Sequence, residues 1–182
     1  MKQRHPNRSM VAPLPYRVLS LSLYGLQPAV VMKTSRPSAK DNPASKKFFA
    51  IKAAISDPSA SVFNFAAQKT MYGGKLISAG DEIFLFASEN EGGAGLIASG
   101  IVITAELVPK APGIARQTPR VSITVKRQRL ADRHLGRSEL KPFSTWDDGQ
   151  PTTELNFKFY RQATNKIVGI SDAAAAFLRE RF

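Results

Sequence analysis

The chain has 182 residues, of which 43% are hydrophobic, and its formal net charge is +12. This length fits one domain with a tail. The chain has no cysteine and only two histidines, and His5 lies in the expected tail. These counts exclude disulfides, thiolate metal sites and a cysteine nucleophile, and they argue against a Ser-His-Asp triad or a multi-histidine metal site. We expect no metal and no cofactor, and the charge indicates a polyanionic partner, DNA or RNA first.

The N-terminal quarter of the chain is basic and rich in proline. Residues 1–50 carry nine Lys and Arg residues against the single acid Asp41, and six prolines fall within residues 1–46. Such a composition cannot bury enough apolar surface to fold. We therefore expect residues 1–46 to form a disordered basic extension and residues 47–182 to form the folded domain.

One apolar run interrupts this extension, at residues 18–26. It follows basic residues, as the apolar region of a signal peptide does, but it is short and no clean cleavage site follows it. No run in the chain is long enough to span a membrane. We expect a cytoplasmic protein without a membrane partner, and the sequence leaves the oligomeric state open.

The first half of the expected domain contains three strand-like segments and one mixed segment. Residues 48–52, 83–87 and 96–107 are rich in β-branched and aromatic residues, which favours strands. Residues 61–69 are mixed, and we predict a short helix that ends at Gly73 and Gly74.

A polar, glycine-rich loop separates the last two of these strands, at residues 88–95. A P-loop would need a Lys and a Ser or Thr after its last glycine, and Gly95 is followed by leucine. A dinucleotide fingerprint would have to open a helix, whereas β-branched residues follow here. Glu89 and Glu91 would also repel a pyrophosphate. We therefore predict a hairpin loop that uses glycine for positive φ.

The second half of the domain alternates polar and apolar residues twice, at 120–126 and 153–160, and each segment predicts a half-buried strand. Residues 166–170 predict a further short strand. Ser171 is a good N-cap for a final helix. The fold class that follows is α+β, mainly β: a small mixed β-barrel with a few packed helices and a C-terminal helix.

Three motifs resemble the PUA-like β-barrels, especially their EVE and ASCH domains. The run GDEIFLFAS at residues 80–88 is similar to their Gly-Asp strand with its following serine, and LIASGIV at 96–102 is similar to the returning strand. FFAIK at 48–52 resembles the aromatic first strand of EVE domains, which ends in lysine. The resemblance covers roughly residues 47–182, without the Trp-rich segments typical of EVE domains.

The resemblance implies a PUA-like barrel whose glycine hairpin lies at the rim of a pocket, with Ser88 at the pocket mouth. Proteins of this group commonly bind RNA or DNA, and the YTH and EVE types hold a modified base in an aromatic pocket. Some ASCH proteins are small hydrolases or nucleases.

A base pocket needs aromatic faces for stacking and polar groups for the base edge. Trp146, the only tryptophan, lies in a polar loop and is either a pocket wall or a plug at one end of the barrel. Arg161 and Asn165 follow an expected strand and either contact nucleic acid or lie in a solvated turn. The candidate pocket residues are Phe49, Lys52, Ser88, Trp146, Tyr160 and Asn165.

The segment 116–141 is the strongest electrostatic candidate, with eight Lys and Arg residues against two acids. In a helix, Arg129, Arg133 and Arg137 would share a face and repel one another, which a polyanion would relieve. The alternative is a solvated arginine-rich face. The candidate phosphate-binding residues are Arg116, Arg120, Lys126, Arg127, Arg129, Arg133, Arg137 and Arg161.

These features favour a nucleic-acid-binding module that reads modified bases in DNA or RNA in an aromatic pocket. The second hypothesis is a small hydrolase or nuclease acting on nucleosides or RNA, with Lys52, Lys75 and Glu106 as the nominees for catalysis. The third is a protein-interaction domain that uses its charge for solubility. On balance we expect binding rather than catalysis.

Overall fold

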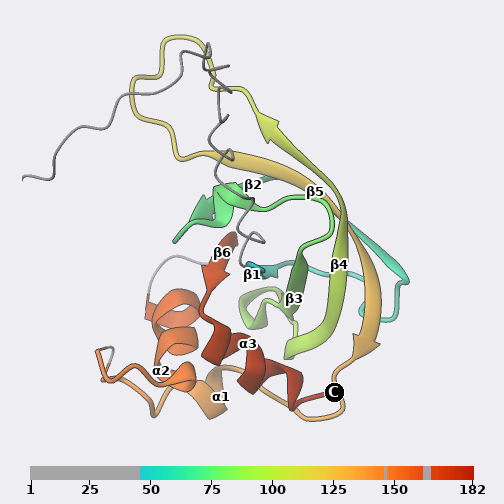
Figure 1. The fold of residues 1–182 in the computed structure, drawn as a ribbon, viewed down its shortest axis with the longest axis vertical. Helices are drawn as coiled ribbons and strands as arrows, with labels where there is room; N and C mark the ends of the chain where they lie inside the picture. Colours follow the sequence, from blue (N-terminus) through green and yellow to red (C-terminus); the bar gives the residue numbers. More distant parts are fainter. Residues whose placement is uncertain (1–45, 146, 162–164) are drawn as a thin grey trace, which may run out of the picture. The chain divides into compact units, whose positions relative to one another are not determined.

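The computed structural model describes residues 46–145, 147–161 and 165–182 of the chain. Within these residues, six strands close into a barrel in the order β1-β3-β4-β5-β2-β6 (Figure 1). Their bounds are β1 Phe48–Ala53, β2 Val62–Met71, β3 Glu82–Ala87, β4 Gly95–Val108, β5 Arg120–Leu130 and β6 Lys166–Ile170. The predicted strands at 48–52, 83–87, 96–107, 120–126 and 166–170 are confirmed.

The barrel mixes parallel and antiparallel pairs, as predicted. β1 pairs in parallel with β3 and antiparallel with β6, and β2 pairs in parallel with β6 and antiparallel with β5. Because β1 and β3 run in the same direction, their C-terminal ends meet at one edge of the barrel. Residues that follow these two strands are therefore neighbours, although some 35 positions separate them in the sequence.

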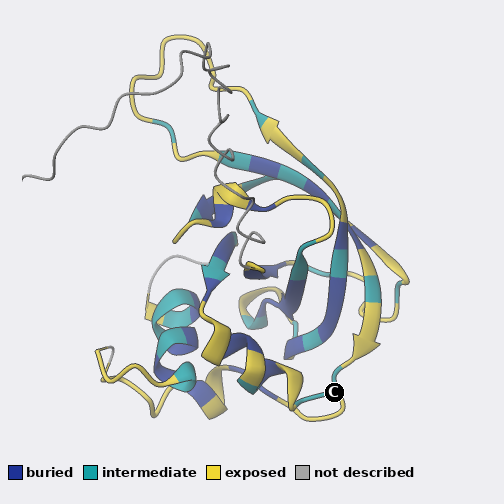
Figure 2. Cartoon of the chain, viewed as in Figure 1, coloured by how far each residue is buried: buried dark blue, intermediate teal, exposed yellow. Residues whose placement is uncertain are grey.

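Successive side chains of each strand point to opposite faces, so the barrel has two cores. Phe49 and Ile51 of β1 join a cluster inside the barrel. Phe48 and Ala50 join a second cluster, between the outside of the barrel and the helices. Figure 2 shows buried residues both in the strands and on the helix faces beside them.

Three short helices gather on one side of the barrel (Figure 1): α1 Arg137–Leu140, α2 Pro151–Asn156 and α3 Asp172–Arg179. A π-helical segment, η3 Phe157–Arg161, continues α2. The predicted C-terminal helix is confirmed, and the Ser171 hydroxyl caps it by accepting a hydrogen bond from the backbone N–H of Ala174 at 3.1 Å. No helix in the described ranges is long and apolar enough to cross a membrane.

The predicted strand at 153–160 is wrong. Pro151 occupies the first turn of α2, where its missing N–H costs nothing. Leu155 and Phe159 are four positions apart and both are buried in the outer core. The same two residues fit alternation and helical spacing equally well, so the sequence pattern alone was ambiguous.

The predicted helix at 61–69 is also wrong, because this segment lies in β2. Phe63 and Phe65 point into the barrel, two residues apart, as strand alternation requires. A shift in register after Phe65 and a positive φ of 48° at Ala67 break the alternation that would have identified the strand.

The glycine-rich loop is a hairpin between the antiparallel strands β3 and β4, as predicted. It contains a 3₁₀ turn, η2 Glu89–Glu91, which ends at Gly92 with φ 81°. Gly95 also has φ 81°, and a β-carbon there would overlap the Leu135 carbonyl. The glycines therefore permit a tight turn against the segment that leads into α1.

Candidate functional site

The parallel pair β1 and β3 brings a lysine and a glutamate together at one end of the barrel. Ala53 pairs with Ala87, and the backbone N–H of Ser88 donates to the Ala53 carbonyl at 2.9 Å. Lys52 Nζ then lies 2.7 Å from Glu89 Oε2. The Lys52 side chain is 0% exposed and that of Glu89 is 21% exposed, so this ion pair forms largely out of water.

Tyr160, from η3, covers this ion pair. Lys52 Nζ lies 3.8 Å from the centroid of the Tyr160 ring, a close cation–π contact. The Tyr160 hydroxyl donates to Glu89 Oε1 at 2.5 Å. The ring is thus held at its face by a cation and at its hydroxyl by a carboxylate.

Arg137, at the start of α1, completes the cluster. Its backbone N–H donates to Glu89 Oε1 at 2.9 Å, and its guanidinium donates to Asn90 Oδ1 at 3.1 Å. The guanidinium carbon lies 5.5 Å from the centroid of the Tyr160 ring. Three segments distant in the sequence therefore converge on Glu89.

The surroundings set the protonation states of this cluster. Burial lowers the pKa of Lys52, against the opposing effect of Glu89. Burial alone would raise the pKa of Glu89, but the contacts with Lys52 and Tyr160 outweigh it and bring the pKa below its ordinary value. Burial and the hydrogen bond to Glu89 raise the pKa of Tyr160. At neutral pH the glutamate is ionised and the tyrosine is a hydrogen-bond donor.

Three buried polar atoms of the cluster are incompletely satisfied by the described residues. The Ser88 hydroxyl has no hydrogen-bond partner there, and Lys52 Nζ and Glu89 Oε2, despite their ion pair, make no well-aligned hydrogen bond. A buried donor without a partner costs about 1–3 kcal/mol. Structural sites rarely tolerate this cost, whereas functional sites often do.

A cavity of about 400 Å³ opens beside Tyr160. Its lining residues are Arg137, Lys141, Ser144, Asn156, Tyr160 and Arg161. Arg161 Nη1 donates to the Ser144 carbonyl and Asn156 Nδ2 donates to the Phe143 carbonyl, each at 2.7 Å. The cavity thus combines an aromatic ring, an amide and three cations, which suits a planar ligand that carries negative charge.

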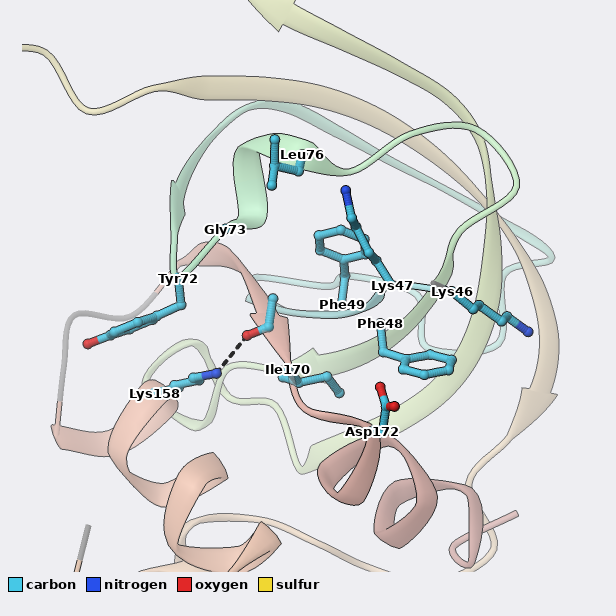
Figure 3. A pocket seen from close by; sticks show the side chains of 11 residues that line it. Lys46, Lys47, Phe48, Phe49, Tyr72, Gly73, Leu76, Lys158, Ile170 and Asp172 are labelled. Atoms are coloured by element: carbon cyan, nitrogen blue, oxygen red, sulfur yellow. Dashed lines mark hydrogen bonds between the residues drawn. The ribbon is translucent and has the colours of Figure 1, made fainter. Parts of the chain in front are cut away.

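A second cavity, of about 330 Å³, lies elsewhere on the domain (Figure 3). Its lining includes Lys46, Lys47, Tyr72, Lys158 and Asp172. One of its lysines, Lys158, donates to the Gly169 carbonyl and to Glu154 Oε1, each at 2.7 Å (Figure 3). Because these partners already engage the ammonium, the cavity beside Tyr160 is the stronger candidate.

The structure brings three of the proposed pocket residues together: Lys52, Ser88 and Tyr160. It places Phe49 on the opposite face of β1, inside the barrel. Asn165 is exposed before β6, with φ 58°. Trp146 lies outside the described residues, so its proposed role stays a prediction.

The proposed phosphate-binding residues are spread over several surfaces. Arg137 and Arg161 line the cavity beside Tyr160, whereas Arg129 lines another cavity with Glu82 and Arg179. Arg116 and Arg133 are exposed in loops, and Lys126 is exposed on β5. Arg120 and Arg127 donate to backbone carbonyls, of Ala67 and Ser59.

The arginine face considered at residues 129–137 does not form. Arg129 lies in β5, Arg133 in the following loop and Arg137 in α1. The strand β5 continues to Leu130, which the high density of charge beyond residue 126 concealed.

The sequence did not identify Glu89, Lys141 or Asn156 as site residues. In the sequence, Glu89 is evident only as a charge that repels phosphate, although it directly follows Ser88. Asn156 was hidden by the expectation of a strand at 153–160, since its position depends on α2.

Solved structures share this architecture. Human THYN1, in a complex with DNA that contains 5-methylcytosine, is 16% identical with a TM-score of 0.54, over 74% of this chain and 96% of that chain. The DUF55 domain of human thymocyte nuclear protein 1 is 15% identical with a TM-score of 0.51, over 73% and 96%. A Pseudomonas putida protein is 14% identical with a TM-score of 0.50, over 74% and 99%.

At these identities the likeness defines the fold. The chain has a closed, mixed β-barrel fold of the kind found in human THYN1 and in the DUF55 domain of human thymocyte nuclear protein 1. No protein-family model matches the sequence, and no curated protein sequence matches it significantly.

Proposed function

We propose that this chain binds nucleic acid and reads a modified base, which it holds in the cavity beside Tyr160. The observation that carries the proposal is the lining of that cavity, where one aromatic ring lies among Arg137, Lys141 and Arg161. The net charge of +12 supports a polyanionic ligand. The fold supports it further, since human THYN1 with the same fold forms a complex with DNA containing 5-methylcytosine.

In this proposal the residues divide the work between stacking and charge. The Tyr160 ring packs against the base, and Arg137, Lys141 and Arg161 contact the phosphates beside it. In the proposal, the Asn156 side chain contacts the base edge. Lys52 and Glu89 act as positioning residues, because they hold the Tyr160 ring and its hydroxyl.

The test is the binding of the full chain to oligonucleotides that differ in one cytosine, methylated or unmodified at C5, as single strands and as duplexes. Fluorescence anisotropy would give the Kd of each. We expect tighter binding to one methylated form. Tyr160→Leu should weaken binding by about tenfold or more, since a stacked ring contributes about 1–3 kcal/mol, and should remove the discrimination. Tyr160→Phe keeps the ring and should retain most of the affinity and most of the preference for the methylated oligonucleotide.

Equal binding of both oligonucleotides would exclude reading of 5-methylcytosine at this site. If Tyr160→Leu has a normal thermal midpoint and still prefers the methylated oligonucleotide as the wild type does, Tyr160 is not part of the base site.

A second candidate function, hydrolysis of a nucleoside or of RNA, is favoured by one observation. Lys52 is a buried lysine with a lowered pKa beside a glutamate, an arrangement that suits proton transfer. Chromatography of modified nucleosides and RNA incubated with the protein tests it. Turnover that Lys52→Met abolishes would support this function, and no turnover would leave the binding function alone.

A further inference from the structure

The register of the barrel aligns cations on four neighbouring strands. Lys52 of β1 pairs with Lys166 of β6, Lys166 pairs with Lys69 of β2, and Lys69 pairs with Arg120 of β5. Directly paired residues extend their side chains from the same face of a sheet. Four strands in a row thus present a cation at the same level, although the four residues are spread over residues 52–166 of the sequence.

This row lies on the outside of the barrel. The neighbours Ile167 and Val121 belong to the interior cluster, so Lys166 and Arg120 point outward by alternation. Lys69 is exposed, and Lys166 and Arg120 are half-buried. Lys52, at one end of the row, is the residue covered by Tyr160.

In the described part of the chain, no carboxylate neutralises the three outer cations of this row. Among the described residues, Lys166, Lys69 and Arg120 form no ion pair with a carboxylate. Glu106 of β4 is the register partner of Ser122, which is two positions from Arg120 along β5. Glu106 forms no ion pair with Arg120 among the described residues. Lys166 Nζ lies 2.6 Å from the Met71 sulfur, which is a weak acceptor.

Like charges placed directly opposite each other in a sheet are destabilising. Consistent with this, burial and the neighbouring Lys69 lower the pKa of Lys166. A sequence that only needed solubility could spread these charges, whereas here they are adjacent and have no carboxylate partner among residues 46–145, 147–161 and 165–182. An anionic partner would relieve the repulsion.

We propose that Lys166, Lys69 and Arg120 form a track for the phosphodiester backbone of the nucleic acid, leading across the outer face of β6, β2 and β5 to the Tyr160 site. The track rests on the proposed function and extends it, because it places the backbone on paired strands and takes only Arg120 from the basic segment 116–141. Arg120 already donates to the Ala67 carbonyl, which fixes its position at the far end. The two lysines are the contacts to phosphate that the proposal tests.

The experiment measures the salt dependence of Kd for the full chain and for Lys69→Gln/Lys166→Gln, on the methylated and unmodified oligonucleotides. Each phosphate contact contributes about 0.7 to the slope of log K against log salt on a single strand, and about 0.9 on a duplex. The double variant should therefore lose about 1.4 from the slope on a single strand. Its preference for the modified base should not change.

The matched control is Lys47→Gln/Lys75→Gln, which removes the same charge from two exposed lysines outside the row. Its slope should stay close to that of the wild type. The thermal midpoint of Lys69→Gln/Lys166→Gln without nucleic acid should equal or exceed that of the wild type, since a repulsion is removed. With an unchanged or higher thermal midpoint, a weaker salt dependence of binding cannot be attributed to unfolding of the variant.

The outcomes separate the track from the proposed function. If the wild type prefers the methylated oligonucleotide and the salt slope of Lys69→Gln/Lys166→Gln equals that of the wild type, the track is overturned and base reading stands. An equal loss of slope in the control also overturns it, since charge anywhere would then suffice. If only Lys69→Gln/Lys166→Gln shows a weaker salt dependence, and the protein binds both oligonucleotides equally, the track is supported and base reading is excluded. No binding by the wild type overturns both.

Discussion

The domain contains two lysine–glutamate pairs that look alike and differ in how fully they are bonded. In each, Nζ lies 2.7 Å from a carboxylate oxygen and a tyrosine ring is nearby, Tyr160 for Lys52 and Tyr72 for Lys158. Lys158 also donates to the Gly169 carbonyl. Its partner Glu154 accepts the backbone N–H and the hydroxyl of Ser171.

The pair at Lys52 lacks this completeness. Its ammonium is fully buried without a well-aligned hydrogen bond, and the neighbouring Ser88 hydroxyl has no partner among the described residues. Glu154 thus ties α2 to the N-terminus of α3, whereas Glu89 holds a ring at the edge of a cavity. The difference teaches that the completeness of bonding, more than the ion pair itself, separates a structural site from a candidate binding site.

The most direct way to break this comparison is to remove each ion pair as a whole, by Lys→Met together with Glu→Gln. Lys158→Met/Glu154→Gln also removes the hydrogen bond from Lys158 to the Gly169 carbonyl, so we expect the free energy of unfolding to fall by about 1–3 kcal/mol. Lys52→Met/Glu89→Gln removes a buried ion pair and leaves no lone buried charge, a change that is often neutral or stabilising. Urea unfolding of both variants measures the difference. If Lys52→Met/Glu89→Gln is destabilised as much as Lys158→Met/Glu154→Gln, the pair at Lys52 is structural as well.

The next test compares two aromatic residues by their effect on binding. Trp146→Ala should weaken nucleic-acid binding by roughly tenfold or more, since a stacked aromatic contributes about 1–3 kcal/mol. The loss should not depend on salt, and the preference for a modified base should shrink. Tyr72→Ala, at the fully bonded pair, should leave Kd unchanged. Titrations at two salt concentrations would measure both.

The control for Trp146 is stability. A tryptophan that plugs the barrel would cost about 3–5 kcal/mol when replaced by alanine. A severely destabilised Trp146→Ala protein would favour the plug, and a folded one with unchanged discrimination would remove Trp146 from the site.

Acid should weaken both pairs, because the contacts lower the pKa of Glu89 and of Glu154 below the ordinary value of 4.5 despite their burial. Below that value the unfolded chain binds more protons than the folded one, so stability falls as the pH drops through the folded-state pKa. Unfolding between pH 6 and about pH 3 should show this decline. Glu89→Gln and Glu154→Gln should each make it shallower; an unchanged decline in either variant would mean that its pair does not contribute.

The smallest effect is expected from the N-terminal extension, which belongs to neither pair. Deleting residues 1–45 keeps Lys46, whose Nζ lies 3.4 Å from Glu82. We expect the thermal midpoint to change by less than about 5 °C, which corresponds to about 1 kcal/mol for a domain of this size. A larger fall would show that the extension packs on the domain.

The sequence predicted the parts of the fold in which one local signal dominates. Dense β-branched and aromatic residues marked β1, β3, β4 and β6, and Ser171 marked the start of α3. It failed where two periodicities overlap. Leu155 and Phe159 fit a strand and a helix alike, and only packing against the outer core decided between them.

By itself the sequence determined the class of barrel, the hairpin role of the glycines and the excess of positive charge. Its resemblance to PUA-like proteins pointed to Lys52 and Ser88, and the need of a base pocket for aromatic rings added Tyr160 as a candidate. Only the tertiary structure decided that Glu89 joins them, because a parallel strand pair brings the residues after β1 and β3 together. It alone aligned Lys166, Lys69 and Arg120, because register across strands is set by barrel closure and by the bulge in β2, neither of which is a local property of the chain.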